Sequence, residues 1–204
     1  MILTDETEKI FRQGLTGQSF DHAKGLDELI EQKAYDAIYR SGIYWPVCHY
    51  EKALNALIQW SNPEYIFRAG KFWQQFDPVR GLNALISMRS ARYIYYAGLD
   101  WKGFPYDTGM KALVDLQNSE FLFYAGTHWK KFDFIEGSQA LLVSRDLQYI
   151  YKAGAMWKEF DYQNGWLELE RRVQEGRLWR GRAFENPKWR RALFSIWQEM
   201  VAAR

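Results

Sequence analysis

Residues 62–88 of the chain read NPEYIFRAGKFWQQFDPVRGLNALISM, and this stretch decides the fold. Its tryptophan belongs to a series that recurs every 28 residues without a slip: Trp45, Trp73, Trp101, Trp129 and Trp157. The Ala-Gly pair that precedes it returns with the same spacing: Ala69-Gly70, Ala97-Gly98, Ala125-Gly126 and Ala153-Gly154. A fixed period of this length indicates one supersecondary unit copied in tandem.

The period extends over almost the whole chain of 204 residues. Counted from Thr7, the sequence divides into seven units of 28 residues: 7–34, 35–62, 63–90, 91–118, 119–146, 147–174 and 175–202. We therefore expect residues 1–204 to form a single elongated helical-repeat domain.

Each unit contains two short helical patterns. In the first, Asn62 before Pro63 is a helix start, because its side chain can accept hydrogen bonds from free backbone amides. Apolar and small residues then follow at helical spacing from Ile66 to Trp73, which places this tryptophan on the inner face of the helix. The cap position is filled in later units by residues of the same kind: Ser90, Asn118 and Asp146.

The second pattern, residues 77–88, again begins with a cap and a proline, Asp77-Pro78. Gly81, Leu82 and Leu85 form its apolar face. We expect linkers of two to four residues between the patterns, so consecutive helices must lie antiparallel. The chain is therefore predicted to be all-α, an α-solenoid of about seven tandem helix-turn-helix repeats.

The unit resembles the tetratricopeptide repeat superfamily, including its Sel1-like branch. The resemblance rests on an Asn-Pro-Glu opening (residues 62–64), a small-Gly-x-x-aromatic segment (residues 69–73) and a Gly-Leu-x-x-Leu helix (residues 81–85). Repeats of that superfamily are longer, about 34 residues, so each helix here must be shorter. The resemblance implies an α-solenoid with a concave surface that binds peptides or proteins, and it implies no catalytic residues.

Composition excludes several classes of protein. Hydrophobic residues make up 48% of the chain, which favours a buried core, and the net charge of +2 is not that of a general nucleic-acid binder. No apolar run approaches the roughly 18 residues of a membrane span. The acidic start and the single cysteine favour a cytoplasmic location without a signal peptide or a disulfide.

One position of the first helix is a candidate partner-binding column. It is occupied in successive units by cations and phenols: Arg12, Arg40, Arg68, Tyr96, Tyr124, Lys152 and Arg180. Arginine and tyrosine are enriched at binding hot spots, which favours a protein contact. The alternative is a solvated face, because Asp36 and Glu64 each precede an arginine of the column by four residues, the favourable order for an ion pair within a helix.

The neighbouring aromatic positions have two possible interpretations. Phe67, Tyr95, Phe123 and Tyr151 recur one residue before the column. In the tetratricopeptide-like register they would line a groove, whereas the helical projection places them in the core between repeats. We favour the core for these rings and for the tryptophans.

The chain offers few residues for chemistry. Cys48 replaces a phenylalanine of the repeat, which favours a role in the core, and His22 and His49 alone do not make a zinc site. We therefore expect no catalytic residues, cofactor or metal. The predicted function is a non-catalytic protein-binding scaffold, either an adaptor or a stoichiometric inhibitor, and a protein with an acidic surface is a candidate partner. The alternative is nucleic-acid binding through the basic end, since residues 171–204 hold nine basic and three acidic residues.

Overall fold

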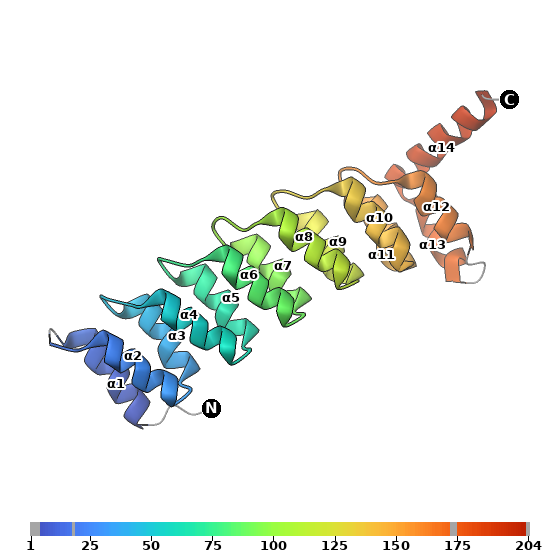
Figure 1. Ribbon diagram of the computed structural model, residues 1–204. Coiled ribbons are helices and arrows are strands. Elements are labelled where there is room, and N and C mark those ends of the chain that lie inside the picture. The colour runs from blue at the N-terminus through green and yellow to red at the C-terminus, as the bar shows by residue number, and fades with distance from the viewer. Residues whose placement is uncertain (1–4, 18, 172–174, 203–204) are drawn as a thin grey trace. The chain divides into compact units, whose positions relative to one another are not determined.

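The computed structural model describes residues 5–17, 19–171 and 175–202, and every regular element within these ranges is an α-helix. The chain divides into two compact units, Met1–Pro105 and Tyr106–Arg204, which we describe separately (Figure 1). The first unit contains α1 (Asp5–Thr16), α2 (His22–Glu31), α3 (Tyr35–Tyr44), α4 (Tyr50–Gln59), α5 (Pro63–Phe72), α6 (Pro78–Ser87) and α7 (Ala91–Asp100). The second contains α8 (Tyr106–Asp115), α9 (Ser119–His128), α10 (Phe134–Ser144), α11 (Leu147–Met156), α12 (Tyr162–Arg171), α13 (Glu175–Glu185) and α14 (Pro187–Ala202). The predicted all-α repeat is confirmed.

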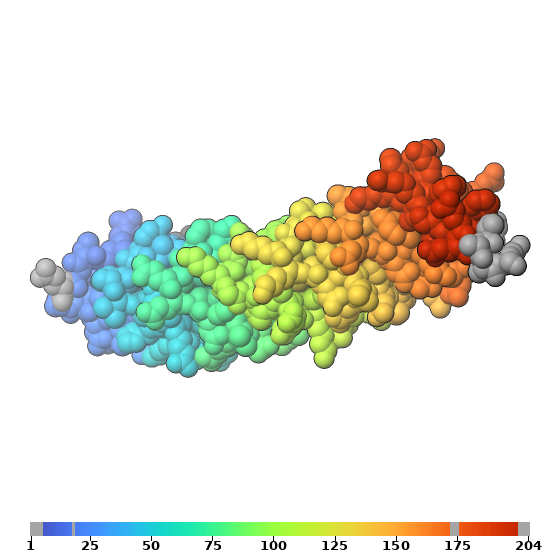
Figure 2. Space-filling view, turned by 90° about the horizontal axis from the view of Figure 1, so that it is seen from above, coloured from blue at the N-terminus to red at the C-terminus, as the bar shows by residue number. Residues whose placement is uncertain are grey.

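The helices of each unit form hairpins that stack on one another. We call the odd-numbered helices A helices and the even-numbered ones B helices. In the first unit α1 packs on α3, α3 on α5 and α5 on α7, while α2 packs on α4 and α4 on α6. In the second unit α9 packs on α11 and α11 on α13, while α8 packs on α10, α10 on α12 and α12 on α14. The space-filling view shows successive hairpins of each unit in contact along the surface (Figure 2).

The predicted helix caps are confirmed at several starts. Asp77 accepts hydrogen bonds from the backbone N–H groups of Val79 and Arg80, both at 3.0 Å, and Asn62 accepts one from Tyr65 at 3.3 Å. Asn118 caps α9 in the same way. The prediction was wrong at Ser90 and Asp146, whose side chains form no such bond.

Of the two kinds of linker, one is longer than the expected two to four residues and the other has the expected length. Five residues usually separate each A helix from the B helix that follows it, as in the segment 73–77 between α5 and α6. The return to the next A helix takes two or three residues. This turn is short because one residue adopts the left-handed conformation in which helices often end, with φ between 51° and 56° at Lys33, Ser61, Arg89, Gln117 and Arg145.

The tryptophans lie one residue beyond the A helices rather than within them. Helix α5 ends at Phe72, and Trp73 is extended (φ −74°, ψ 143°). This geometry directs the indole to the preceding hairpin, where its Nε1 donates a 3.0 Å hydrogen bond to the Tyr39 carbonyl. A Cβ added to Gly42 would lie 2.2 Å from that nitrogen, so only glycine leaves room for the ring. The same contact joins Trp45 to Gly14, Trp101 to Gly70, Trp157 to Gly126 and Trp189 to Gly154.

The last hairpin departs from the 28-residue period. The position 28 residues after Trp157 is Glu185, and the buried indole is supplied four residues later by Trp189, which is fully buried. Leu178, at the place where Ile66 and Ile94 are fully buried, is 57% exposed. Helix α13 therefore presents a different face to its unit than the other A helices do.

Ser138 on α10 provides a test of the core. It replaces the large apolar residues that other B helices place there, is 1% exposed, and its hydroxyl has no hydrogen-bond partner. We expect Ser138→Ala to raise the free energy of unfolding by about 1 kcal/mol, because it removes a buried unpaired polar group. Ser41→Ala is the matched control, since Ser41 is equally buried but donates to the Ile38 carbonyl at 2.7 Å. Urea denaturation should show stabilisation by the first change only, and an equal gain from both would contradict the assignment.

Candidate protein-contact face

The predicted column lies on the A helices and is divided between the two units. Arg40, Arg68 and Tyr96 belong to α3, α5 and α7 of the first unit, whereas Tyr124, Lys152 and Arg180 belong to α9, α11 and α13 of the second. Each set is therefore considered within its own unit. All six residues are intermediate in solvent exposure, neither buried nor fully exposed.

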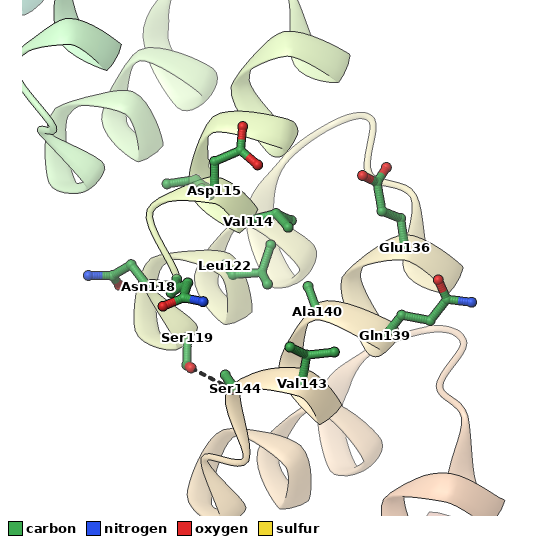
Figure 3. Close-up of a pocket in the computed structure, with 12 residues that line it drawn as sticks. Val114, Asp115, Asn118, Ser119, Leu122, Glu136, Gln139, Ala140, Val143 and Ser144 are labelled. Atoms are coloured by element: carbon green, nitrogen blue, oxygen red, sulfur yellow. Dashed lines mark hydrogen bonds between the residues drawn. The ribbon is translucent and has the colours of Figure 1, made fainter.

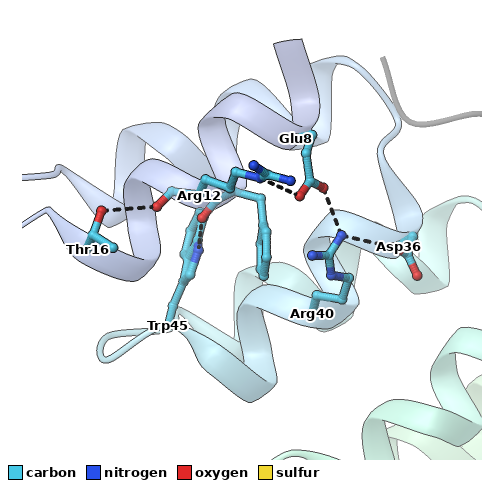
Figure 4. Close-up of polar contacts among 7 residues, drawn as sticks. Glu8, Arg12, Thr16, Asp36, Arg40 and Trp45 are labelled. Atoms are coloured by element: carbon cyan, nitrogen blue, oxygen red, sulfur yellow. Dashed lines mark hydrogen bonds and ion pairs between the residues drawn. The ribbon is translucent and has the colours of Figure 1, made fainter. Parts of the chain in front are cut away.

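At the start of the first unit, the column residue Arg40 holds two helices together. Its guanidinium donates to Glu8 on α1 at 2.9 Å, lies 3.6 Å from Asp36 on its own helix, and covers the Phe11 ring at 3.9 Å from the centroid (Figure 4). Arg12 donates to the same Glu8 carboxylate at 2.9 Å. The ion pair between Asp36 and Arg40 predicted from their spacing is confirmed, so Arg40 contributes to packing.

Arg68 is less constrained. Its side chain is 43% exposed and forms the predicted pair with Glu64 at 2.5 Å, within the same helix. Exposed pairs of this kind contribute only about 0.3–0.5 kcal/mol, so the guanidinium remains available to a partner at little cost. Tyr96 contacts the Phe67 ring at 6.0 Å and has the Arg92 guanidinium 5.6 Å from its centroid, which covers part of its surface.

In the second unit the column residues also pack on their neighbours. The Tyr124 ring lies 5.5 Å from Phe123, and the Lys152 ammonium lies 4.8 Å from the centroid of Tyr149. Burial raises the pKa of Tyr149 to about 12, with the Glu120 carboxylate adding to the effect. Arg180 is half-buried on α13. These residues are on one position of the repeat, as predicted, but they do not form a freely exposed row.

The structure shows exposed aromatic residues that the sequence reasoning missed. Tyr44 and Phe72 occupy the same place on α3 and α5 and are 61% and 52% exposed. Each follows a column arginine by four residues, so it lies on the same side of its helix. That spacing could have revealed them.

We define the A face of the first unit as Arg40, Tyr44, Arg68 and Phe72. Helices α3 and α5 pack directly on each other, so these four side chains belong to one surface. Next to it, Lys71 on α5 donates to Asp100 on α7 at 2.9 Å, and its ammonium lies 5.6 Å from the Phe72 centroid. The surface combines exposed rings with cations that are paired but not buried.

The aromatic positions that precede the column are packing contacts between hairpins. Phe123 is 3% exposed and contacts Tyr149 on the next A helix at 5.6 Å. Phe67 contacts Tyr93 on the next A helix at 5.8 Å. Tyr95 is 8% exposed, and Tyr151 contacts Trp179 on the next A helix at 5.5 Å. These rings therefore lie between repeats, as the helical projection predicted.

One hollow in the second unit is lined mainly by uncharged side chains. This cavity of about 440 Å³ lies between α8 and α10 and is drawn in Figure 3. Leu122, Ala140 and Val143 form its apolar part, and the carboxylates of Asp115 and Glu136 lie at its rim. Neither histidine nor cysteine lines it. Among the residues that the structure places, no group of three or more His, Cys, Asp or Glu could hold a metal ion.

Cys48 has the environment of an unreactive thiol. It is half-buried, and this burial raises the pKa of the thiol to about 11. A nucleophilic cysteine needs a lowered pKa and an adjacent base, whereas this thiol stays protonated at neutral pH. The geometry of Cys48 therefore supports the packing role that we expected, although its side chain is only partly covered.

The contacts of the Glu8 carboxylate with Arg40 and Arg12 are expected to weaken in acid. The hydrogen bonds from Arg40 and then Arg12 hold the pKa of this carboxyl below its ordinary value. A lowered pKa in the folded state contributes stability above the ordinary pKa, and that contribution is lost as the pH falls through the folded value. We expect Glu8→Gln to remove part of the stability loss between about pH 5 and about pH 3. Thermal denaturation across this range should show a shallower decline for the variant, and parallel curves would contradict the contact.

No helix in the ranges that the structure places is both long and apolar enough to span a bilayer. No family model matches the chain, and no curated protein or solved structure is significantly similar to it. The likeness of the repeat to tetratricopeptide units therefore stays a resemblance of motifs.

Proposed function

We propose that this protein is a non-catalytic, protein-binding repeat scaffold of the cytoplasm, acting as an adaptor or stoichiometric inhibitor. The observation that carries the proposal is the A face, where Tyr44 and Phe72 are more than half exposed on adjacent helices beside Arg68. Exposed aromatic rings beside arginine have the composition of binding hot spots. Because the A helices are fixed by buried tryptophans, the face is held rigid, which lowers the entropy cost of binding.

The pairing of the cations refines this proposal. Arg40 is held by Glu8 and Phe11, so it supports the face rather than providing its main contact. The ion pair of Arg68 is with an exposed carboxylate on its own helix, and its guanidinium also lies 5.7 Å from the Tyr65 centroid. It is the column residue of the first unit best able to exchange that ion pair for one with an acidic group of a bound protein. Tyr96, Tyr124 and Lys152 have a weaker claim, because no phenylalanine, tyrosine or tryptophan follows them by four residues as Phe72 follows Arg68. Arg180 belongs to the second unit and is a separate candidate.

The test is affinity capture from extracts of cells that produce the protein. A triple variant, Tyr44→Ser, Arg68→Ser and Phe72→Ser, should lose a partner that the unchanged protein retains at physiological salt. Val79→Ser is the matched control, because Val79 is 55% exposed but lies on a B helix of the same unit. Equal capture by the triple variant and the control would refute the choice of face, and the absence of any specific partner would refute the proposed function.

A further inference from the structure

The last two helices carry more basic than acidic residues. Residues 175–202, which form α13 and α14, contain six basic and three acidic residues. In the first unit, arginines and lysines of several helices form ion pairs, such as Arg40 with Glu8 and Lys71 with Asp100. In the part of α13 and α14 that the structure places, Arg177, Arg182 and Arg190 are exposed and form no ion pair. A strong positive potential therefore remains at this end of the second unit.

Helix α14 also leaves two aromatic rings exposed among these charges. Phe194 is 57% exposed and Trp197 is 59% exposed, and their rings stack with centroids 6.1 Å apart at 29°. Both lie on the side of the helix that carries Arg190, since the three residues are spaced at i, i+4 and i+7. We call these three residues the C-terminal ridge. Beyond its first turns α14 extends away from α12 and α13, which explains why the ridge is uncovered (Figure 1).

The other side of α14 faces its own unit. Trp189 is fully buried, and Leu193 and Ile196 are partly covered. Leu193 and Ile196 are thus turned toward the unit, whereas the two rings and Arg190 are among the residues of α14 left exposed. A helix that inserts into a membrane would instead present its broad apolar side to the lipid.

We propose that the C-terminal ridge binds single-stranded nucleic acid without strong sequence preference. Unpaired bases stack on exposed aromatic rings, and arginine contacts the phosphates between them. The positive charge of Arg177, Arg182 and Arg190 complements the polyanion. The inference is independent of the A face, because the ridge lies in the other unit and uses a different kind of contact.

Fluorescence anisotropy with labelled oligo(dT) and oligo(rU) tests the proposal. We expect single strands to bind more tightly than a duplex of equal length, with an affinity that falls as salt rises. Trp197→Ala and Phe194→Ala should each weaken binding at least about fivefold, as the loss of a stacked base predicts. Arg190→Gln should reduce the magnitude of the salt slope by about one. Phe72→Ala, which removes a similarly exposed ring from the A face, should leave binding unchanged.

Three outcomes would overturn the inference. The first is no binding at about 0.1 M salt. The second is equal binding of duplex and single strand with no effect of the ring substitutions, which would indicate charge attraction alone. The third is Trp197-dependent binding to vesicles of anionic lipid by a protein that does not bind the oligonucleotides. Because Trp197 and Phe194 are more than half exposed, their substitution is not expected to unfold the chain, and circular dichroism provides the check.

Discussion

Replacing Trp157 by alanine is expected to lower the free energy of unfolding by about 3–5 kcal/mol, the usual cost of removing a buried tryptophan. The side chain is 1% exposed, and its indole contacts the rings of Phe132 and Phe134 at 5.1 and 5.8 Å. Its Nε1 also donates a 3.1 Å hydrogen bond to the Phe123 carbonyl. The alanine variant would leave this carbonyl without the indole donor. Urea denaturation followed by circular dichroism measures the loss.

Trp197→Ala is the matched control for this prediction. It removes the same side chain from a position that is 59% exposed, where substitutions usually change stability by less than about 0.5 kcal/mol. A similar loss for both variants would show that the tryptophans at the hairpin junctions have no special role.

Gly126→Ala is the second change with a large expected effect. A Cβ at this position would lie 2.5 Å from Cε2 and 2.6 Å from Nε1 of Trp157, and the buried ring has no space to move aside. We expect a loss of about 1–3 kcal/mol from overpacking, even though alanine is the better helix former.

Gly181→Ala is expected to change the stability of the protein in the opposite direction. Gly181 also lies inside an A helix, but a Cβ there would meet no atom within 4 Å. The same substitution should therefore stabilise the protein by about 0.5–1 kcal/mol through helix propensity. If thermal denaturation showed both glycine variants to be stabilised, the close approach of the indole to Gly126 would be contradicted.

The repeat could be derived from the sequence because its contacts are themselves periodic. The recurrence of Trp73 and of the small residues before it predicted buried indoles. In the structure the Trp73 ring packs against Gly42, which belongs to the preceding hairpin. The caps at Asn62 and Asp77 were recognisable because a side-chain acceptor before proline is a local signal. What the period could not show is that Trp73 lies outside the helix, since a 3.6-residue projection continues past the helix end.

The candidate site was less predictable, because exposure depends on what neighbouring hairpins cover. Arg40 and Arg68 are equivalent in sequence, yet only Arg40 is held by an acidic residue of another helix. The exposure of Phe72 follows from the end of α5, which the sequence alone did not locate. At the last hairpin, the replacement of the expected tryptophan by Trp189 changes the register, so the exposed rings of α14 could not be predicted by extending the period.

The central claim is that, within each unit, neighbouring hairpins are joined by a tryptophan that occupies the space of a missing Cβ. A double-mutant cycle between Gly126→Ala and Trp157→Phe tests it most directly, with the free energy of unfolding measured in urea. The smaller ring should make room for the added methyl group, so the cost of Gly126→Ala should fall by about 1 kcal/mol or more in the Trp157→Phe background. If the two changes were additive within about 0.3 kcal/mol, the indole and the glycine would not be coupled, and the account of the repeat would be contradicted.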